Sequence, residues 1–377
     1  MRILMIAPEP FFEPRGTPFS EYHRIRALVD LGHAVDLVTY PFGRNVDLPG
    51  LTVHRAWRPP FVKRVGIGPS LVKVPLDALL AITAFHVAFK WRREFGLVHS
   101  HEEGGAIGLI VASMLGLPHV YDMHSSLPEQ LSNFKFSSSR VLLAAFRWLE
   151  RRLIRRSRVV IVICRHLEDV VRGIQDDARV VLIENAPGSG STQGSIEGAA
   201  DGRAVRERYE VPAGVPLVLY TGTFEAYQGL DLLFASMRHV QRDRPDARLM
   251  LVGGQRDQIE TARREACQAG IDAVTVFTGE QPADAIPGYL AAADVLVSPR
   301  SRGKNTPLKI YQYLRAGRPI VATNLLTHTQ VLDETVACLA DATPESFAGG
   351  ILRVIGDAPY AQALATEAAR LAATRYT

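Results

Sequence analysis

Four cationic side chains lie close together in the first half of one short stretch of the sequence, SPRSRGKNTPLKIYQYLRAGRPIVAT, residues 298–323. They are Arg300, Arg302, Lys304 and Lys309. The stretch has the pattern of a strand end, a glycine-containing turn, a helix that opens at Thr306-Pro307, and a second strand. The first turn of a helix has unpaired N–H groups that attract an anion. Here these groups belong to Leu308 and Lys309, because Pro307 has no N–H. The stretch therefore predicts a phosphate-binding site.

Histidine and acidic side chains follow two apolar runs in the first half of the chain. HSHEEGGA contains His99, His101 and Glu102, and YDMHSS contains Asp122 and His124. Both segments begin at the ends of predicted strands, so we expect them at the carboxyl edge of a sheet, where ligands bind. A zinc site is not favoured, because the ligands show no i, i+4 spacing, and no metal site is predicted. His124 is either a hydrogen-bonding residue beside a reacting group, which we favour, or a structural histidine.

Glycines mark further loops at predicted strand ends. Gly16 precedes a predicted helix, and Gly222 and Gly229 enclose the loop of YTGTFEAYQGLDLL. A glycine lets a ligand approach the backbone, and the following helix N-terminus favours an anion. A plain turn glycine is the alternative at Gly16. No G-x-G-x-x-G pattern is present, so a nicotinamide dinucleotide site is disfavoured.

The elements that must position these residues alternate along the whole chain. Short β-branched runs occupy residues 2–7, 34–40, 51–56, 97–100, 118–122, 159–163, 180–184, 216–222, 247–254, 273–279, 293–299, 318–323 and 335–340. Continuous apolar runs are typical of parallel strands covered on both faces, and helical patterns separate them. We predict an α/β protein with two Rossmann-like, doubly wound domains, residues 1–186 and 205–377, facing each other across a cleft. The glycine- and serine-rich segment between them, residues 187–204, predicts a flexible loop or linker.

The composition is that of an ordinary globular protein. The chain has 377 residues, of which 47% are hydrophobic and 22% are charged, which suits two domains. Its three cysteines are far apart and predict buried, reduced thiols. The N-terminus has no apolar run long enough for a signal peptide. The most apolar segment, Val74–Phe89, is shorter than the about 20 residues of a bilayer span. We expect a buried or surface-lying helix there, and a cytoplasmic protein.

The basic excess of the chain is concentrated in its first half. The segment Phe146–Arg158, FRWLERRLIRRSR, carries six arginines in a helical pattern. A solvated helix face is one interpretation, and peripheral contact with anionic lipid headgroups at the inner face of a membrane is the other. Nucleic acid is not an expected partner, because no pattern of stacking aromatic residues accompanies the charge.

The order of these motifs resembles that of family four glycosyltransferases. The matching segments are LGHAVDLVT, LVHSHEEGG, YDMHSS, YTGTFEAYQGLDLL, MLVGG and AGRPIVATN, together with the loop at Gly16. The resemblance covers nearly the whole chain and implies a GT-B fold. It also implies a retaining hexosyltransferase that moves a sugar from a nucleoside-diphosphate donor to a glycan or lipid-linked acceptor. The C-terminal domain would hold the donor, and the N-terminal domain would hold the acceptor. By analogy, His124 lies near the donor sugar.

Four positions depart from the family pattern at the donor site. The family usually has an arginine and a lysine that neutralise the diphosphate, and the matching residues here are Thr223 and Gln228. The family often has two glutamates eight positions apart, and the matching residues are Lys304 and Gln312. The nearby cations could compensate for the lost positive charge, which is the interpretation that we favour. The alternative is a catalytically silent protein of the same fold that binds nucleotide, glycan or a partner. A sugar-nucleotide epimerase is a third option, but no acid–base pair can be assigned for it.

We therefore expect a donor site in the second domain and a metal-independent transfer without a cofactor. The expected donor-site residues are Gly222, Thr223, Gln228, Arg300, Lys304, Asn305, Thr306, Leu308, Lys309 and Gln312, with Thr278 and Gly279 at the nucleobase. His124, Lys304 and Lys309 are the candidate catalytic residues, and Gly16 and His124 face the donor from the first domain. Gln312 lacks a carboxylate's charge-assisted hydrogen bonds, so weaker donor affinity is expected. The chain stops about where the family continues with a returning segment, so either truncation or completion by another chain is expected.

Overall fold

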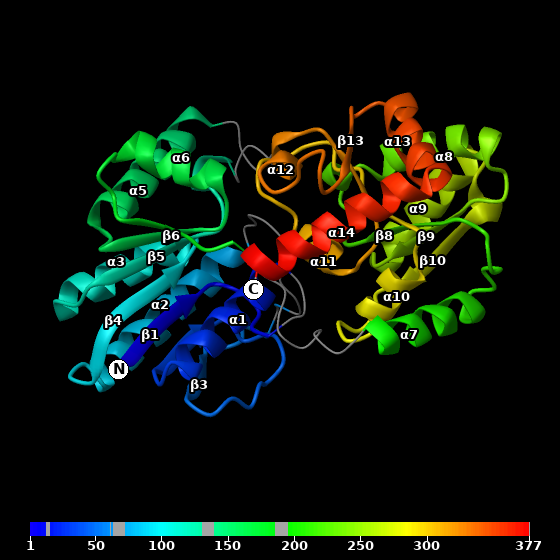
Figure 1. The fold of residues 1–377 in the computed structure, drawn as a ribbon. Coiled ribbons are helices and arrows are strands. Elements are labelled where there is room, and N and C mark those ends of the chain that lie inside the picture. The colour runs from blue at the N-terminus through cyan, green and yellow to red at the C-terminus, as the bar shows by residue number, and fades with distance from the viewer. Residues whose placement is uncertain (13–15, 61, 63–71, 130–138, 185–194, 377) are drawn as a thin grey trace. The chain divides into compact units, whose positions relative to one another are not determined.

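The apolar runs predicted as strands form two parallel sheets (Figure 1). The protein is described by a computed structural model over residues 1–12, 16–60, 62, 72–129, 139–184 and 195–376. The chain divides into two compact units, Met1–Glu184 (unit 1) and Asn185–Thr377 (unit 2). Each unit has its own sheet and its own hydrophobic core, as two Rossmann-like domains require. The predicted α/β, doubly wound architecture is confirmed in each unit.

Unit 1 contains a seven-stranded sheet in the order β3-β2-β1-β4-β5-β6-β7. The strands are β1 (Arg2–Ala7), β2 (Ala34–Thr39), β3 (Leu51–Arg55), β4 (Phe95–His101), β5 (His119–Met123), β6 (Val159–Val162) and β7 (Val180–Leu182). All neighbouring pairs are parallel. The order reverses between β1 and β4, so the crevice for a ligand is expected at the carboxyl ends of these two strands.

Helices cover both faces of this sheet. They are α1 (Gly16–Asp30), α2 (Lys73–Lys90), α3 (Gly104–Leu115), α5 (Arg140–Arg156) and α6 (Arg165–Ile174). On one face Ile25 of α1 packs with Met5 and Leu37. On the other face Leu80 of α2 and Val111 of α3 pack in one core cluster with strand residues such as Leu4, Ile6 and Val98. The strands are thus buried from both sides, which explains their continuous apolar sequences.

Unit 2 contains a six-stranded parallel sheet in the order β10-β9-β8-β11-β12-β13. The strands are β8 (Leu217–Thr221), β9 (Arg248–Val252), β10 (Thr275–Gly279), β11 (Val295–Ser298), β12 (Ile320–Thr323) and β13 (Cys338–Ala340). The helices are α7 (Ser195–Arg208), η2 (Ala226–Gln228), α8 (Leu230–Asp243), α9 (Arg256–Gln268), η3 (Asp272–Val274), α10 (Ile286–Ala292), α11 (Leu308–Arg315), α12 (Leu326–Thr329), α13 (Pro344–Gly356) and α14 (Ala358–Arg375). Here the strand order reverses between β8 and β11.

The predicted linker, residues 187–204, differs from the structure in its second part. Residues 187–194 lie outside the described residues, but α7 begins at Ser195, so the last ten positions are helical rather than a loop. The glycines suggested a loop, yet Gly202 serves a close helix contact. A Cβ at Gly202 would lie 2.8 Å from the carbonyl carbon of Ala291 in α10. Arg206 secures the same contact by donating from Nε to the Ala292 carbonyl at 2.8 Å.

The C-terminal helix α14 packs within unit 2. Tyr376, just after the helix, is buried and makes an edge-to-face contact with Tyr311 of α11, with ring centroids 5.1 Å apart. Arg315 donates to the Tyr376 carbonyl at 2.9 Å. The last helical pattern of the sequence is therefore part of the core of this unit and braces α11.

Candidate functional site

A buried lysine lies at the point where the strand order of unit 2 reverses. Lys309 is in the first turn of α11, and its Nζ lies 3.7 Å from the ring centroid of Tyr220 on β8. Among the described residues, no hydrogen-bond acceptor contacts this ammonium. Burial, reinforced by the charge of Arg300, lowers the pKa of Lys309 well below its usual value. A buried cation without a counter-charge is unfavourable in the free protein, so this arrangement is suited to an anionic ligand.

Glycines bring the backbone of neighbouring strand ends close to Lys309. Gly222 has φ of +138°, and a Cβ at this position would lie 3.1 Å from Lys309 Nζ. Gly253, after β9, has φ of +119°, and its Cβ would lie 2.1 Å from the Gly222 carbonyl oxygen. Both positions therefore require glycine, for conformation and for space. Gly222 thus lies beside the Lys309 ammonium, and its role in donor binding stays a prediction.

Arg300 holds its own loop rather than projecting away from it. Its Nε donates to the Arg302 carbonyl and its Nη1 to the Asn305 carbonyl, each at 2.9 Å. The guanidinium carbon lies 5.0 Å from the ring centroid of Tyr227. Burial lowers the pKa of Arg300, but an arginine remains charged at neutral pH. Arg300 therefore both shapes the loop and adds positive charge beside Lys309.

The loop that precedes α8 and the loop that precedes α11 are in direct backbone contact. Ser301 donates its N–H to the Tyr227 carbonyl at 3.2 Å. Gly229 has φ of +76°, and a Cβ there would lie 2.0 Å from the Pro299 carbonyl oxygen. Gln228 is buried beside this contact. The position of Arg300 is therefore determined jointly by both loops.

His328 braces the same loop from α12. Its Nδ1 lies 2.9 Å from the Thr323 carbonyl, and its Nε2 lies 2.8 Å from the Ser298 hydroxyl. Burial lowers the pKa of His328 to about 3, so the ring is neutral, with Nδ1 donating and Nε2 accepting. Thr327 completes the brace by donating to the Asn305 carbonyl at 2.7 Å. Neither residue was predicted, because a helical turn after β12 gives no sequence signal of its own.

The remaining residues predicted for the donor site fall into three groups. Thr223, Gln228, Asn305, Thr306, Leu308 and Gln312 lie on the two loops and on α11, around Lys309. Lys304 is exposed on its loop, in contrast to the buried Lys309. Thr278 and Gly279 end β10, two strands away from β8. The Thr278 carbonyl already accepts a hydrogen bond from Gln281 Nε2, and the Gly279 carbonyl accepts one from the Gly253 N–H. The structure thus brings most of the predicted residues to one edge of the sheet.

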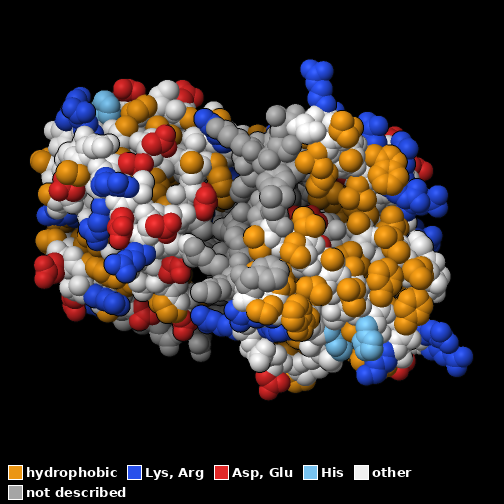
Figure 2. Space-filling view, turned by 180° about the vertical axis from the view of Figure 1, so that it is seen from behind, with side chains coloured by type: hydrophobic (Ala, Val, Ile, Leu, Met, Phe, Trp, Pro, Cys, Tyr) orange, Lys and Arg blue, Asp and Glu red, His pale blue; other side chains and the backbone are white. Residues whose placement is uncertain are grey.

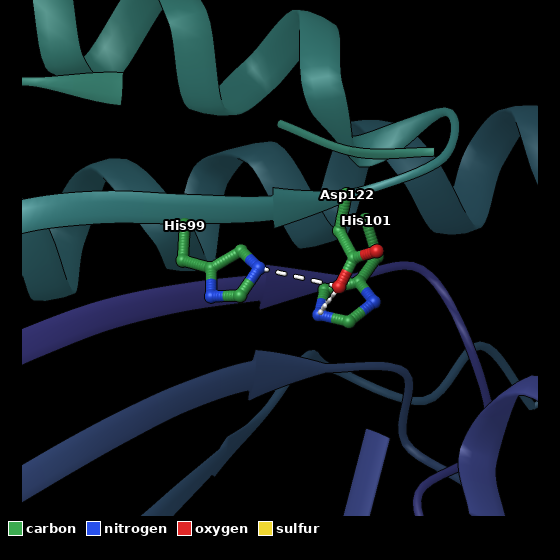
Figure 3. A group of neighbouring side chains, drawn as sticks. All are labelled: His99, His101 and Asp122. Atoms are coloured by element: carbon green, nitrogen blue, oxygen red, sulfur yellow. Dashed lines mark hydrogen bonds and ion pairs between the residues drawn. The ribbon is translucent and has the colours of Figure 1, made fainter. Parts of the chain in front are cut away.

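Unit 1 contains a second candidate site, at the carboxyl ends of β4 and β5 (Figure 3). His99 and His101 are two positions apart on β4 and point to the same face of the sheet, and their rings stack with centroids 5.0 Å apart. The Asp122 carboxylate on β5 lies 3.3 Å from His99 Nε2 and 3.6 Å from His101 Nε2. All three side chains are buried.

These three residues form the one grouping in the described part of the chain whose ligand atoms are close enough to hold a metal ion. However, Arg24 of α1 forms an ion pair with the same Asp122 carboxylate. A metal ion would have to enter beside this buried guanidinium, and two cations repel strongly where the dielectric is low. The arrangement therefore fits a buried ion-pair network better than a metal centre. The expectation of no metal site stays a prediction.

His124 and two glutamates complete this network. His124 Nε2 lies 3.2 Å from Asp122 Oδ1, and burial lowers the pKa of His124 to about 4. Oε1 of Glu21, on α1, lies 3.6 Å from His101 Nε2, and burial raises the pKa of Glu21 to about 7. Glu9, after β1, also has a raised pKa because it is buried near Glu21. His124 is thus a neutral imidazole at pH 7, able to accept or donate one hydrogen bond.

The sequence reasoning identified His124 here but missed the residues of α1. Glu21 and Arg24 are on a helix in which charged residues are usually assumed to face solvent. Both residues lie within about one helical turn of Ile25, which is buried, and this nearness to a buried position was the available signal that they face inward. Gly16 is the first residue of α1, but the loop before it, residues 13–15, lies outside the described residues. The predicted contact of Gly16 with the reacting groups stays a prediction.

Two family models match the chain in the order of its units. Residues 22–186 match the model described as a glycosyl transferase 4-like domain, and residues 215–357 match the model described as glycosyl transferases group 1. Together these matches span most of both units. The chain belongs to glycosyltransferase family four.

Relatives of this glycosyltransferase family member include two sugar transferases from Streptomyces. The 2-deoxystreptamine N-acetyl-D-glucosaminyltransferase of Streptomyces fradiae is 30% identical over 73% of this chain and 66% of its own length. The alpha-D-kanosaminyltransferase of Streptomyces kanamyceticus is 25% identical over 76% of this chain and 75% of its own length. A Bacillus subtilis relative, 32% identical, is matched over only 41% of its length. The chain thus spans less than two thirds of some of the relatives that it matches.

Solved structures match the whole chain of this family member. Sucrose-phosphate synthase from Thermosynechococcus elongatus has a TM-score of 0.79 at 19% identity, covering 100% of this chain and 95% of that one. Anabaena HepE in complex with UDP has a TM-score of 0.74 at 17% identity, covering 100% of this chain and 96% of that one. At these identities the likeness shows the fold alone. It confirms the GT-B class that the sequence predicted.

Proposed function

We propose that the protein is a retaining hexosyltransferase that binds a nucleoside-diphosphate sugar in unit 2. The observation that carries the proposal is the buried ammonium of Lys309, which has no hydrogen-bond acceptor among the described residues and lies beside Gly222 and Arg300. A diphosphate would supply the missing counter-charge. The unpaired N–H groups at the start of α11 would add further hydrogen bonds to the same anion.

In this proposal the protein positions the donor and supplies positive charge, and no side chain acts as a covalent nucleophile. As the sugar–phosphate bond breaks, negative charge grows on the departing diphosphate, and Lys309 and Arg300 stabilise it. A bound diphosphate favours the charged form of Lys309, so the positive charge is in place before the sugar–phosphate bond breaks. Lys304, being exposed, is assigned a smaller part than the sequence suggested. Neither a metal ion nor a cofactor is part of this mechanism.

His124 is proposed as a hydrogen-bonding residue near the donor sugar. Its lowered pKa supports a neutral ring at physiological pH, and the Asp122 carboxylate lies 3.2 Å from its Nε2. A neutral imidazole can hydrogen-bond a sugar hydroxyl or the backbone of a sugar-binding loop.

The acceptor is proposed as a glycan or a lipid-linked glycan. One of the two Streptomyces relatives is named for 2-deoxystreptamine. A Mycolicibacterium smegmatis relative, 34% identical over 32% of this chain, is named for a phosphatidylinositol monomannoside acceptor. Within the described residues, no helix is long and apolar enough to cross a membrane. The arginines of α5 support a peripheral contact with anionic lipid in a cytoplasmic protein.

The second candidate function is that of a catalytically silent binding protein. The observation that favours it is the uncharged pair Thr223 and Gln228, at positions where the family usually has cations for the diphosphate.

Titration calorimetry with a panel of nucleoside diphosphates at low salt separates the two proposals. Binding at micromolar concentration, lost in Lys309→Ala and retained in Lys304→Ala, supports the transferase. Absence of binding below millimolar concentration favours the silent protein. Donor turnover with a panel of acceptors then tests the transfer itself.

A further inference from the structure

The solvent-facing stripe of α2 carries almost no charge. Its exposed positions are Val74, Ala78, Ile82, His86 and Phe89, spaced by three or four residues, and Lys90 at the C-terminal end of the helix, which is the one charged residue among them. The single acid of the helix, Asp77, is turned inward and accepts a hydrogen bond from the Tyr40 hydroxyl. The outward stripe of a surface helix is normally charged or polar. This helix is therefore apolar on the face that it presents to its surroundings as well as on the face that it buries.

The neighbouring helix α3 extends the apolar surface. Its sequence, GGAIGLIVASML, contains no charged residue, and Ile110 and Met114 are exposed on it. α2 and α3 pack in the same core cluster on one face of the sheet. Figure 2 shows a broad expanse of hydrophobic side chains on unit 1, at the right of that view, with Lys and Arg side chains at its border.

Helix α5, which lies beside α3, supplies charge of one sign. Trp148 and Val141 are exposed on it, and Arg147, Arg151, Arg152, Arg155 and Arg156 are exposed along the same helix. Its single acid, Glu150, is buried and accepts the Leu127 N–H at 2.8 Å. The guanidinium of Arg152 lies 5.7 Å from the centroid of the Trp148 ring. The exposed charges of α5 are thus all positive, next to an aromatic side chain.

The apolar surface is concentrated rather than scattered. Of the fourteen large hydrophobic side chains that are exposed in the described residues, eight lie on α2, α3 and α5 or at the residue before α2. Single exposed hydrophobic residues are ordinary, but a contiguous patch rimmed by polar groups marks a docking surface. We call the outward side of these three helices the α2–α3–α5 face.

We propose that the α2–α3–α5 face docks on one leaflet of a membrane that contains anionic phospholipids. The apolar side chains of α2 and α3 enter the boundary between headgroups and acyl chains, and the arginines of α5 contact lipid phosphates. Exposed Trp148 suits the same boundary, where amphipathic rings are favoured. No helix of the described residues could span the bilayer, so the contact is limited to one leaflet.

Charge decides between a membrane and a second copy of the chain. Two copies that met through this face about a twofold axis would each bring the same arginine row to the interface, without acidic side chains from α5 to meet it. A leaflet with anionic headgroups instead presents the opposite charge. The proposal deepens the peripheral contact suggested above but does not depend on the donor chemistry of unit 2.

Vesicle co-sedimentation tests the proposal on the full chain without donor. The probes are vesicles of phosphatidylcholine alone and vesicles that also contain phosphatidylglycerol, each in about 0.1 M and about 1 M salt, because the Debye length falls from about 10 Å to about 3 Å between them. The apolar variant is Ile82→Glu/Met114→Glu, with Leu326→Glu as its control on an exposed site of unit 2. The charge variant is Arg151→Ala/Arg155→Ala, with Arg242→Ala/Arg264→Ala as its control on exposed sites of unit 2.

The wild type is expected to sediment with anionic vesicles. Partitioning of the apolar variant onto vesicles should fall at least about tenfold at both salt concentrations. The two substitutions remove apolar area that the membrane would bury and place negative charge on the docking face. The charge variant should lose about fivefold per arginine in low salt and little in high salt. Both controls should bind like the wild type, and far-UV circular dichroism should show that all variants are folded.

Three results would overturn the proposal. One is a wild type that binds neither kind of vesicle. Another is loss of binding in the unit 2 controls equal to that in the variants. The third is a concentration-dependent dimer, measured by light scattering, that Ile82→Glu/Met114→Glu abolishes while vesicle binding is absent; the face would then join two copies of the chain. None of these results bears on nucleotide binding, which calorimetry measures separately.

Discussion

Replacing Lys309 by methionine is expected to stabilise the free protein and to abolish diphosphate binding. The side chain is buried, its ammonium has no acceptor among the described residues, and burial lowers its pKa well below the usual value. Each unit by which a pKa is lowered corresponds to about 1.4 kcal/mol against the charged form. Methionine fills a similar volume without this cost. We expect a gain in the free energy of unfolding on the order of 2 kcal/mol at neutral pH.

The sign of the pH dependence follows from the lowered pKa of Lys309. Between its folded and unfolded pKa values, the unfolded chain holds the Lys309 proton more tightly than the folded protein. The stability contributed by this group therefore rises with pH across that window, up to the unfolded value of about 10.4. The advantage of Lys309→Met over the wild type should accordingly shrink as the pH is raised from neutral toward 10.

Thermal unfolding is the assay, with and without the nucleoside diphosphate that binds the wild type in calorimetry. A gain of about 2 kcal/mol in a unit of this size raises Tm by roughly 4–8 °C. This nucleotide at about a hundred times its Kd should stabilise the wild type by about 2.7 kcal/mol, and should leave Lys309→Met unchanged. Lys304→Met, which removes an exposed lysine from the adjacent loop, is the control and should keep both the wild-type Tm and the shift with nucleotide. A variant that is less stable than the wild type, or that keeps the full nucleotide shift, would refute the assignment of Lys309 to an anion site.

Three further predictions concern other buried or substituted groups. Burial raises the pKa of Glu21 to about 7, so the wild-type protein loses stability as the pH rises toward that value. Glu21→Gln lacks this carboxyl, so its free energy of unfolding relative to the wild type should increase by about 2 kcal/mol between about pH 5.5 and about pH 8.5, measured by urea unfolding. Arg24→Met leaves the buried Asp122 carboxylate without its cation and should cost about 3–5 kcal/mol in urea unfolding, whereas the exposed control Arg26→Met should stay within about 0.5 kcal/mol of the wild type. Gln312→Glu should lower the KM for the donor several-fold without changing Tm, since a carboxylate makes hydrogen bonds roughly twice as strong; an unchanged KM would remove Gln312 from the donor site.

The strands and the glycine-containing loops could be predicted because local patterns determine them. Each predicted strand corresponds to an observed strand, since continuous β-branched runs suit strands buried on both faces. The stretch around Lys309 was predicted as an anion site from a helix start next to cations, and the structure brings Gly222 and Arg300 to the same place. These features lie within short segments whose neighbours in space follow from the strand order.

Features that depend on tertiary contacts could not be predicted. Arg300 donates hydrogen bonds to carbonyls of its own loop. The sequence shows several cations near one another but does not reveal which of them holds the loop. Arg24 and Glu21 enter the unit 1 network from a helix with a mixed pattern. Gly202 indicated a loop by composition, although its lack of a side chain permits a close contact between helices.

The backbone contact between Gly229 and Pro299 has a consequence for substitutions in both loops. Because the loop before α8 contacts the loop that carries Arg300, a change at position 228 also acts on the surroundings of Arg300. Gln228→Lys would place a third cation in a buried space that already holds Lys309 and Arg300. The effect of a cation at position 228 should therefore depend on Lys309 and Arg300 rather than add to them.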